Sequence, residues 1–135
     1  MYLIDTNVIS ETIKKSPNEN VLKWLNQLDI YKIYISVVTL GEIRKGIEKL
    51  DLENKKQKLI QWLEVDLLEK FDGRVVSVDP KIADKWGYIC SKGEIPAIDA
   101  LIAASALVNN FKLVTRNTKD FDKISGLEII NPWLP

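Results

Sequence analysis

Four acidic residues stand at positions where a hydrolase could use them: Asp5, Glu42, Asp99 and Asp120. The chain has no histidine, so it lacks the commonest general base and the imidazole ligand of zinc sites, and its single cysteine cannot form an internal disulfide. Carboxylates gathered at one place repel one another unless a divalent cation neutralises them, and oxygen ligands suit Mg²⁺ or Mn²⁺. Such a cluster indicates phosphoryl transfer, in which a metal activates water and stabilises charge on the phosphate.

Asp99 is the most informative of the four because its surroundings on the expected helix are apolar. Its neighbours at helical spacing are Ile95, Ile102, Ala103 and Ala106. A carboxylate in that setting is costly unless it is paired or bound to a cation. Either a backbone amide or a lysine compensates the charge, or Asp99 is a metal ligand. The pattern favours the metal ligand.

Asp5 and Glu42 each have a structural interpretation beside the chemical one. Asp5 opens the run Asp5-Thr6-Asn7, in which every residue is a good helix N-cap. Its position at the carboxyl end of an expected strand favours a ligand-binding role. The segment from Thr39 to Glu42 has the spacing of a capping box, in which the Glu42 carboxylate would bond back to the Thr39 amide. The sequence leaves the structural and functional roles of Glu42 equally open.

The segment Thr115–Phe121 follows an expected strand and offers Asn117 and Asp120 as oxygen ligands. Polar turns of this composition commonly begin a helical turn, so the segment alone is a weak signal. Its importance depends on whether it lies at the same edge of the sheet as Asp5.

Short apolar segments alternate with helical patterns along the chain. The expected strands are Tyr2–Ile4, Lys32–Val38, Val75–Val78, Lys112–Thr115 and Leu127–Ile130. The expected helices cover Asn18–Leu28, Thr39–Leu50 with a charged continuation to Phe71, a segment opened by Asp79-Pro80, and Pro96–Leu107. Strands separated by helices of this length form βαβ crossovers, so the candidate residues can meet where parallel strands end.

Length and composition fit one domain spanning residues 1–135, with 46% hydrophobic and 28% charged residues. We expect a three-layer α/β fold with a central, mostly parallel sheet of four to five strands flanked by helices. Basic and acidic residues are equal in number, so no overall field draws the chain to nucleic acid. No apolar run approaches the roughly 20 residues that span a bilayer, and no secretory segment precedes the first strand, so we expect a cytoplasmic protein.

Four ordered blocks of the sequence resemble the PIN-domain family. They are Leu3–Glu11, Ser36–Gly46, Asp99–Ala104 and Val114–Phe121, and the similarity continues to Asn131-Pro132-Trp133. Within the family the chain is most similar to VapC-type toxins of the FitB-like subgroup. The resemblance implies a PIN-like fold and an endoribonuclease that uses Mg²⁺ or Mn²⁺ to hydrolyse RNA, often transfer or ribosomal RNA. It also implies the toxin of a type II toxin-antitoxin system, held inactive by a small antitoxin protein.

The resemblance also assigns roles by position. Asp5 and Asp99 look like the core magnesium ligands, and Glu42 looks like the third acidic residue. Many relatives have an acidic residue where Asn117 stands, whereas the subgroup with this Thr-Arg-Asn sequence supplies the carboxylate at Asp120. We therefore expect Asp120 as the third metal ligand and fourth catalytic residue, with Asn117 as a neutral ligand or water anchor. The resemblance leaves open whether the site holds one metal ion or two.

Other side chains beside these blocks are expected to support the reaction. Thr6, Asn7 and Thr115 would hydrogen-bond the phosphate or the metal's waters, and Arg116 would neutralise developing charge. Local positive charge for RNA follows Glu42 at Arg44, Lys45, Lys49, Lys55, Lys56 and Lys58. A charged helix face is, however, more often simply solvated. The resemblance implies a homodimer or a toxin-antitoxin hetero-oligomer, with an antitoxin arginine reaching the acidic site.

Three alternatives stay open at this point. A phosphatase of the haloacid-dehalogenase type also has an Asp after its first strand, but it needs a second Asp two residues later, where Asn7 stands. A non-catalytic module, in which the acidic cluster holds a structural cation or a basic partner, is disfavoured because every expected carboxylate is present. A PIN nuclease outside a toxin-antitoxin system would carry the same residues.

Overall fold

A five-stranded parallel sheet forms the centre of the molecule in the computed structural model, which describes all 135 residues. The strands are β1 (Tyr2–Ile4), β2 (Ile33–Ser36), β3 (Val75–Val76), β4 (Lys112–Val114) and β5 (Ile129–Ile130). They lie in the order β3-β2-β1-β4-β5, and every pair is parallel. The sequence prediction of a mostly parallel sheet of four to five strands is confirmed.

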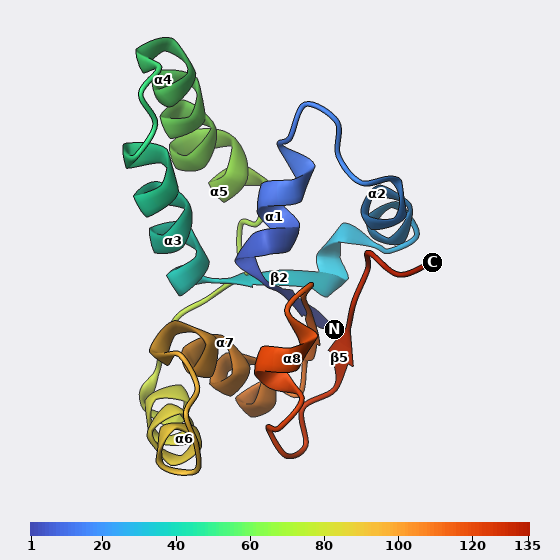
Figure 1. The fold of residues 1–135 in the computed structure, drawn as a ribbon, viewed down its shortest axis with the longest axis vertical. Helices are drawn as coiled ribbons and strands as arrows, with labels where there is room; N and C mark the ends of the chain where they lie inside the picture. The colour runs from blue at the N-terminus through green and yellow to red at the C-terminus, as the bar shows by residue number, and fades with distance from the viewer.

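Helices cover both faces of the sheet, which makes three layers (Figure 1). On one face lie α1 (Thr6–Thr12), α2 (Glu19–Asn26), α3 (Val37–Glu48), α4 (Glu53–Gln61) and α5 (Leu68–Lys70). On the other face lie α6 (Pro80–Ser91), α7 (Ala97–Val108) and α8 (Thr118–Phe121). A 3-10 turn, η1 (Ile30–Lys32), precedes β2, and a π-helical turn, η2 (Trp62–Leu67), joins α4 to α5.

Two hydrophobic cores lie on the two faces of the sheet because neighbouring strand residues point in opposite directions. Leu3 packs into the core beneath α6 and α7, whereas Ile4 packs into the core beneath α1 and α3. Leu113 and Val114 divide between the two cores in the same way. Burial on both faces explains why these strands are continuous apolar runs.

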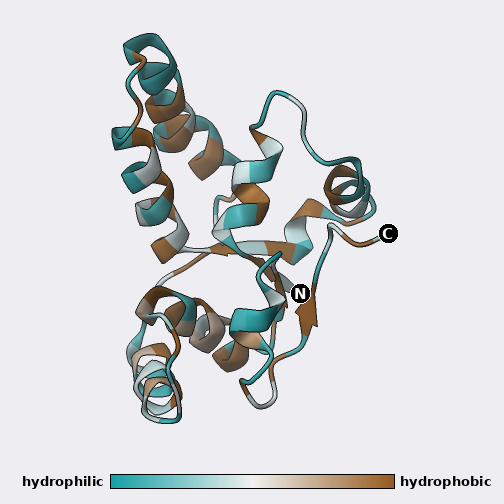
Figure 2. Cartoon of the chain, viewed as in Figure 1, coloured by the Kyte–Doolittle hydropathy of each residue, from teal (hydrophilic) through white to brown (hydrophobic).

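Helix α7 is the most hydrophobic helix of the fold, as Figure 2 shows. From Ala100 to Ala106 all but one of its residues are buried, and it packs along α6. The sequence prediction of a buried helix here is confirmed. No helix of the structure is long and apolar enough to cross a membrane.

One boundary differs from the sequence prediction in a way that affects the site. The strand expected over Lys32–Val38 ends at Ser36, and α3 begins at Val37. The Ser36 hydroxyl caps this helix by accepting a hydrogen bond from the Val38 amide (3.1 Å). β-branched valines fit a strand, but a serine cap outweighs that preference here.

Candidate active site

Asp5 lies where β1 ends and α1 begins, at the carboxyl edge of the sheet. Its side chain is only 4% exposed. One carboxylate oxygen accepts a hydrogen bond from the Thr6 amide (2.8 Å), so the predicted N-cap role is confirmed. The other oxygen accepts from the Thr115 hydroxyl (2.8 Å) and, more weakly, from the Asn7 side-chain amide (3.4 Å). The cap therefore uses only one of the two oxygens, and Thr115 and Asn7 fix the position of the other.

The segment after β4 reaches the same edge because β4 pairs with β1 in parallel register. The Asn7 amide donates to Thr115 Oγ1 (3.3 Å), and the Arg116 backbone amide donates to Asn7 Oδ1 (3.4 Å). Thr115 Oγ1 also accepts from the Asn117 backbone amide (3.1 Å). Asn7 and Thr115 thus connect the two segments and orient Asp5, which is a different contribution from the expected contact with phosphate or water.

Glu42 faces α1 and does not cap its own helix. Its Oε1 accepts a hydrogen bond from the Thr6 hydroxyl (2.5 Å), and the same hydroxyl is hydrogen-bonded to the Thr39 hydroxyl (3.0 Å). The capping-box alternative is wrong, because Ser36 holds the cap position and Thr39 is buried inside α3. Glu42 is therefore held towards Asp5 by the residue that follows Asp5.

Asp99 lies in the first turn of α7 and is half-buried. Its pKa is raised to about 6, first by burial and then by the negative charges of Asp5, Asp120 and Glu42. Neither a hydrogen bond nor a positive side chain contributes to this shift. The structural alternative for Asp99, a carboxylate compensated by an amide or a lysine, is therefore wrong.

The pKa of Asp5 is also raised, chiefly because the carboxyl group is buried. The hydrogen bonds from Thr115 and Thr6 oppose that shift, whereas the charges of Glu42 and Asp120 add to it. The charges of Glu42 and Asp120 act on both Asp5 and Asp99, and that of Asp5 also acts on Asp99, so the four carboxylates lie near one another at one edge of the sheet. Asn117 and Asp120 are both exposed, and Asp120 is the residue of this segment whose charge acts on Asp5 and Asp99.

The donor set fits a hydrated magnesium ion. Four carboxylates without a facing cation form a concentrated negative site, and all the ligand atoms are hard oxygens. No three acidic or cysteine side chains lie close enough to hold an ion by themselves. Mg²⁺ usually keeps several of its waters and needs only one or two direct carboxylate ligands, so it does not require a group of three.

Arg116 lies at the rim of the site and contacts the C-terminal segment. Its guanidinium group lies 5.2 Å from the centre of the Trp133 ring, and its charge also acts on Glu11. The Trp133 carbonyl in turn accepts a hydrogen bond from the Asn20 side chain (2.9 Å). Trp133 was not predicted as a neighbour of the site, although the Asn131-Pro132-Trp133 tail belongs to the sequence resemblance to the PIN-domain family.

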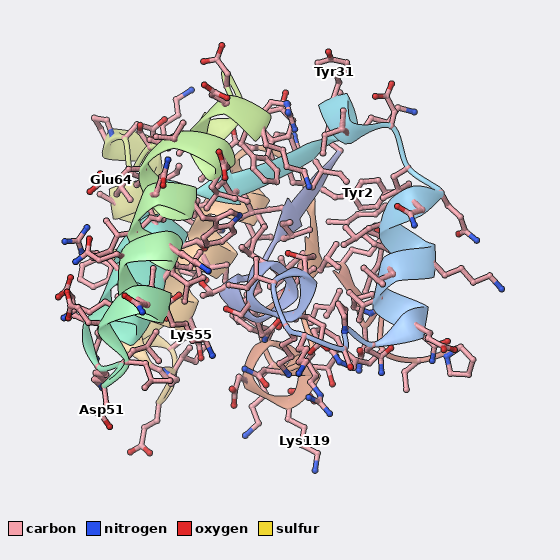
Figure 3. All side chains as sticks on the ribbon, turned by 90° about the horizontal axis from the view of Figure 1, so that it is seen from above. Tyr2, Tyr31, Asp51, Lys55, Glu64 and Lys119 are labelled. Carbon is pink, nitrogen blue, oxygen red and sulfur yellow. The ribbon has the colours of Figure 1, made fainter.

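The expected basic cluster after Glu42 is divided in the structure. Arg44 pairs with Glu48 and Glu64, and Lys56 pairs with Glu48, so these charges are partly neutralised on the surface. Lys55 instead lines a groove of about 630 Å³ between α1, α3 and α4, which reaches Glu42 at one end. Figure 3 shows Lys55 and Lys119 towards one end of the molecule and Tyr2, at the start of β1, towards the other.

Comparison with known proteins agrees with the arrangement of the carboxylates. Residues 2–127 match the PIN domain family. The chain belongs to the PIN-domain family. It is 37% identical to toxin FitB of Neisseria gonorrhoeae over 98% of this chain and 99% of FitB. It is 33% identical to VapC ribonuclease Y4jK of Sinorhizobium fredii over 100% of this chain and 99% of the relative.

A solved structure shares the fold of this PIN domain throughout. The crystal structure of FitAcB from Neisseria gonorrhoeae superposes with a TM-score of 0.93 at 36% identity, and the match covers 100% of both chains. The three-layer architecture predicted from the sequence is therefore that of a full-length PIN domain. Which residues of this chain bind the metal or take part in catalysis is inferred from the geometry of its own site.

Proposed function

We propose that this PIN domain is a magnesium-dependent endoribonuclease that acts as the toxin of a type II toxin-antitoxin system. The observation that carries the proposal is the uncompensated charge at Asp99, which faces three further carboxylates and no positive side chain. Full-length similarity to a protein named as a VapC ribonuclease and to one named as a toxin supports the same conclusion.

Within this site the residues divide into ligands and a water-positioning group. Asp5, Asp99 and Asp120 would hold the metal, in part through its bound waters, and the ion would lower the pKa of a water and stabilise charge on the phosphate. Glu42 is held by Thr6 and accepts a hydrogen bond from the attacking water, which orients it in line with the scissile bond. Mn²⁺ has the same oxygen preference and supports the same chemistry.

The surrounding side chains fix these groups rather than react. Thr115 and Asn7 hold Asp5 in one orientation by hydrogen bonds, and such preorganisation is where much of the rate of a phosphoryl-transfer enzyme originates. Arg116 provides a positive charge at the start of the segment that carries Asp120. Asn117, exposed next to Arg116, binds a water of the metal rather than the metal itself.

Cleavage by the Asp5→Asn and Asp99→Asn variants tests the proposal directly. Each variant keeps the shape of the side chain and removes a charge, so we expect activity on RNA with Mg²⁺ to fall by roughly a thousandfold or more. Asp122→Asn is the matched control, because Asp122 follows α8 and does not affect the pKa of Asp5 or Asp99. Full activity in both active-site variants, or undiminished cleavage in excess chelator, would refute the mechanism.

The groove beside Glu42 supplies a place for the antitoxin. Its wall and floor carry Ile13, Ile43, Ile47, Leu50 and Leu59, and lysines lie at its margin. A helix with an apolar stripe and acidic edges fits this groove, and an arginine at its end would reach the carboxylates. Co-expression with the product of an adjacent small reading frame should yield a complex and relieve growth arrest.

Ile13→Glu tests the groove as the antitoxin site because Ile13 is 38% exposed and lines it. We expect this variant to lose the antitoxin during purification while keeping its ribonuclease activity. Leu134→Glu is the control, since Leu134 is exposed outside the groove. Equal antitoxin retention by both variants would place the partner elsewhere.

A further inference from the structure

A second groove lies on the opposite face of the sheet, between α6 and the segment that follows α8. It encloses about 620 Å³ over an apolar floor that includes Ile89 and Leu107. Its polar lining is mainly basic, with Lys85 on α6, Lys92 directly after α6 and Lys123 after α8. We call it the Tyr88 groove, after the tyrosine that lies between Lys85 and Lys92 in the sequence.

Tyr88 has the exposure and the neighbours of a stacking surface. It is 57% exposed, and the ammonium groups of Lys85 and Lys92 lie 5.2 and 5.1 Å from its ring centre. Neither these two lysines nor Lys123 forms an ion pair, and Glu94 is the one acidic residue in the lining. The Tyr88 groove is therefore a positively charged surface with an accessible aromatic ring, in a chain whose net charge is zero.

The Tyr88 groove adjoins the segments that carry two of the acidic residues. Ile95 in its wall is four residues before Asp99, and Lys123 is three residues after Asp120. Four residues span at most about 14 Å even when fully extended. A strand of RNA whose scissile phosphate lies at the carboxylates can therefore continue into this groove.

We propose that the Tyr88 groove binds an unpaired stretch of the RNA substrate next to the scissile phosphate, an inference that rests on the proposed ribonuclease function. A base stacks on the exposed ring of Tyr88, and the lysines contact the flanking phosphates. Alternating π-faces and phosphates are the features of single-stranded nucleic acid that aromatic and basic side chains recognise together. The carboxylates repel RNA, so binding energy must come from positive surfaces such as this one.

The charge of the groove argues against a second copy of the chain as its occupant. A two-fold interface centred here would bring the same lysines face to face. Like charges held together in this way oppose association, whereas an RNA backbone neutralises them. The groove also lies on the opposite face of the sheet from the one we assign to the antitoxin, so the two ligands would not share a surface.

Binding without cleavage tests this proposal independently of the nuclease reaction. The probe is a fluorescein-labelled single-stranded RNA of mixed sequence and about twelve nucleotides, measured by anisotropy in excess chelator. Tyr88→Ala should weaken binding by roughly tenfold, whereas Tyr88→Phe keeps the ring and should bind like the wild type. Because Tyr88 is largely exposed, both variants should fold normally.

The lysines have a separate signature in the salt dependence of binding. Replacing Lys85, Lys92 and Lys123 together with alanine removes three phosphate contacts, which should reduce the slope of log affinity against log salt by about 2. Lys81→Ala on the same helix is the control, since Lys81 is exposed outside the groove. A duplex RNA of equal length hides its base faces, so Tyr88→Ala should leave duplex binding unchanged.

The outcomes separate this proposal from the proposed function. Unchanged RNA affinity in the groove variants, or no RNA binding by the wild type, would overturn the assignment of the groove. A change from dimer to monomer in Tyr88→Ala with unaltered RNA affinity would also overturn it, in favour of a protein interface. RNA binding that depends on the groove, in a protein that cleaves no RNA with Mg²⁺, would retain the groove and reject the nuclease.

Discussion

Two regions of this molecule bury charged side chains, and only one of them provides protein groups that compensate the charge. Between α5 and β3, the Arg74 side chain is only 7% exposed, yet one of its terminal nitrogens donates to the carbonyls of Ile30 and Ile33 (both 2.6 Å). The other terminal nitrogen donates to the Lys70 carbonyl, and the rings of Phe71 and Tyr31 flank the guanidinium group. Only its Nε lacks a partner.

The acidic edge of the sheet has no such compensation. Asp5 accepts three hydrogen bonds and still has a raised pKa, and Asp99 gains only further negative charge from its neighbours. Protein groups satisfy both terminal nitrogens of the buried arginine, so its role is structural. The carboxylates are left for something outside the chain to neutralise, which is the physical mark of a binding site.

Removing the donors of Arg74 should have the larger effect on stability. Arg74→Met keeps much of the side-chain volume but removes the donors to the carbonyls of Ile30, Ile33 and Lys70, so we expect a loss of about 3 kcal/mol in the free energy of unfolding. The measurement is urea denaturation monitored by circular dichroism. Arg44→Met, which breaks only exposed ion pairs, should change it by less than about 0.5 kcal/mol. Equal effects would mean that the contacts of Arg74 are not structural.

Removing the charge of Asp99 should have the opposite effect and raise the free energy of unfolding at neutral pH. Its pKa is raised to about 6 in the fold, so the folded state holds the proton more tightly than the unfolded chain, and stability falls as pH rises from about 4 to above 6. Without metal, the free energy of unfolding of Asp99→Asn should therefore equal that of the wild type near pH 4 and exceed it by about 1 kcal/mol near pH 7.5. This difference is smaller than the full pKa shift would give, because the carboxyl group is partly solvated.

Magnesium should reverse that advantage. The wild type gains stability from an ion that binds only the folded state, and the variant gains less, so thermal denaturation at pH 7.5 with and without Mg²⁺ measures the linkage. A proton on the Asp99 carboxylate competes with the metal, so magnesium binding should weaken as pH falls through about 6. A destabilised Asp99→Asn in chelator would show that the carboxylate is already compensated by the protein.

Removing the Thr6 hydroxyl changes the acidic edge without removing any charge. Thr6→Val keeps the shape of the side chain and removes its hydrogen bonds to Glu42 and Thr39, so Glu42 loses its orientation. We expect roughly a tenfold fall in kcat for RNA cleavage with little change in KM. Thr12→Val removes a hydroxyl that bonds only the Ile9 carbonyl on the same helix and should leave kcat unaltered. Equal kcat in both variants would remove Glu42 from the mechanism as described.

Much of the fold could be predicted because the strands are short apolar runs separated by amphipathic helices. The errors lie at boundaries where local signals compete. Val37 and Val38 are good strand residues, but the Ser36 cap places them in α3. The π-helical turn over Trp62–Leu67 was not predicted, because the apolar spacing of that segment does not distinguish a π turn from an α-helix.

The site was predictable in part for the same reason. Asp99 stands out in the sequence because its neighbours on the helix are apolar, and the structure leaves it without a compensating partner. The role of Glu42 was left open between a local cap and catalysis, since its contact is with Thr6 in another helix and the spacing of Thr39 also fits a capping box. Trp133 and the Tyr88 groove depend on segments that meet only after folding, so no short-range pattern could identify them.

The position of β1 in the sheet determines when during synthesis this protein becomes active. β1 is the first strand to be made but lies at the centre, between β2 and β4, and the bond from Thr115 to Asp5 joins residues 110 positions apart. Such distant pairing is slow to form and cannot begin until β4 has left the ribosome. A growing chain therefore carries Asp5 for most of its synthesis without a complete active site. The interval gives a partner time to be present before the nuclease assembles.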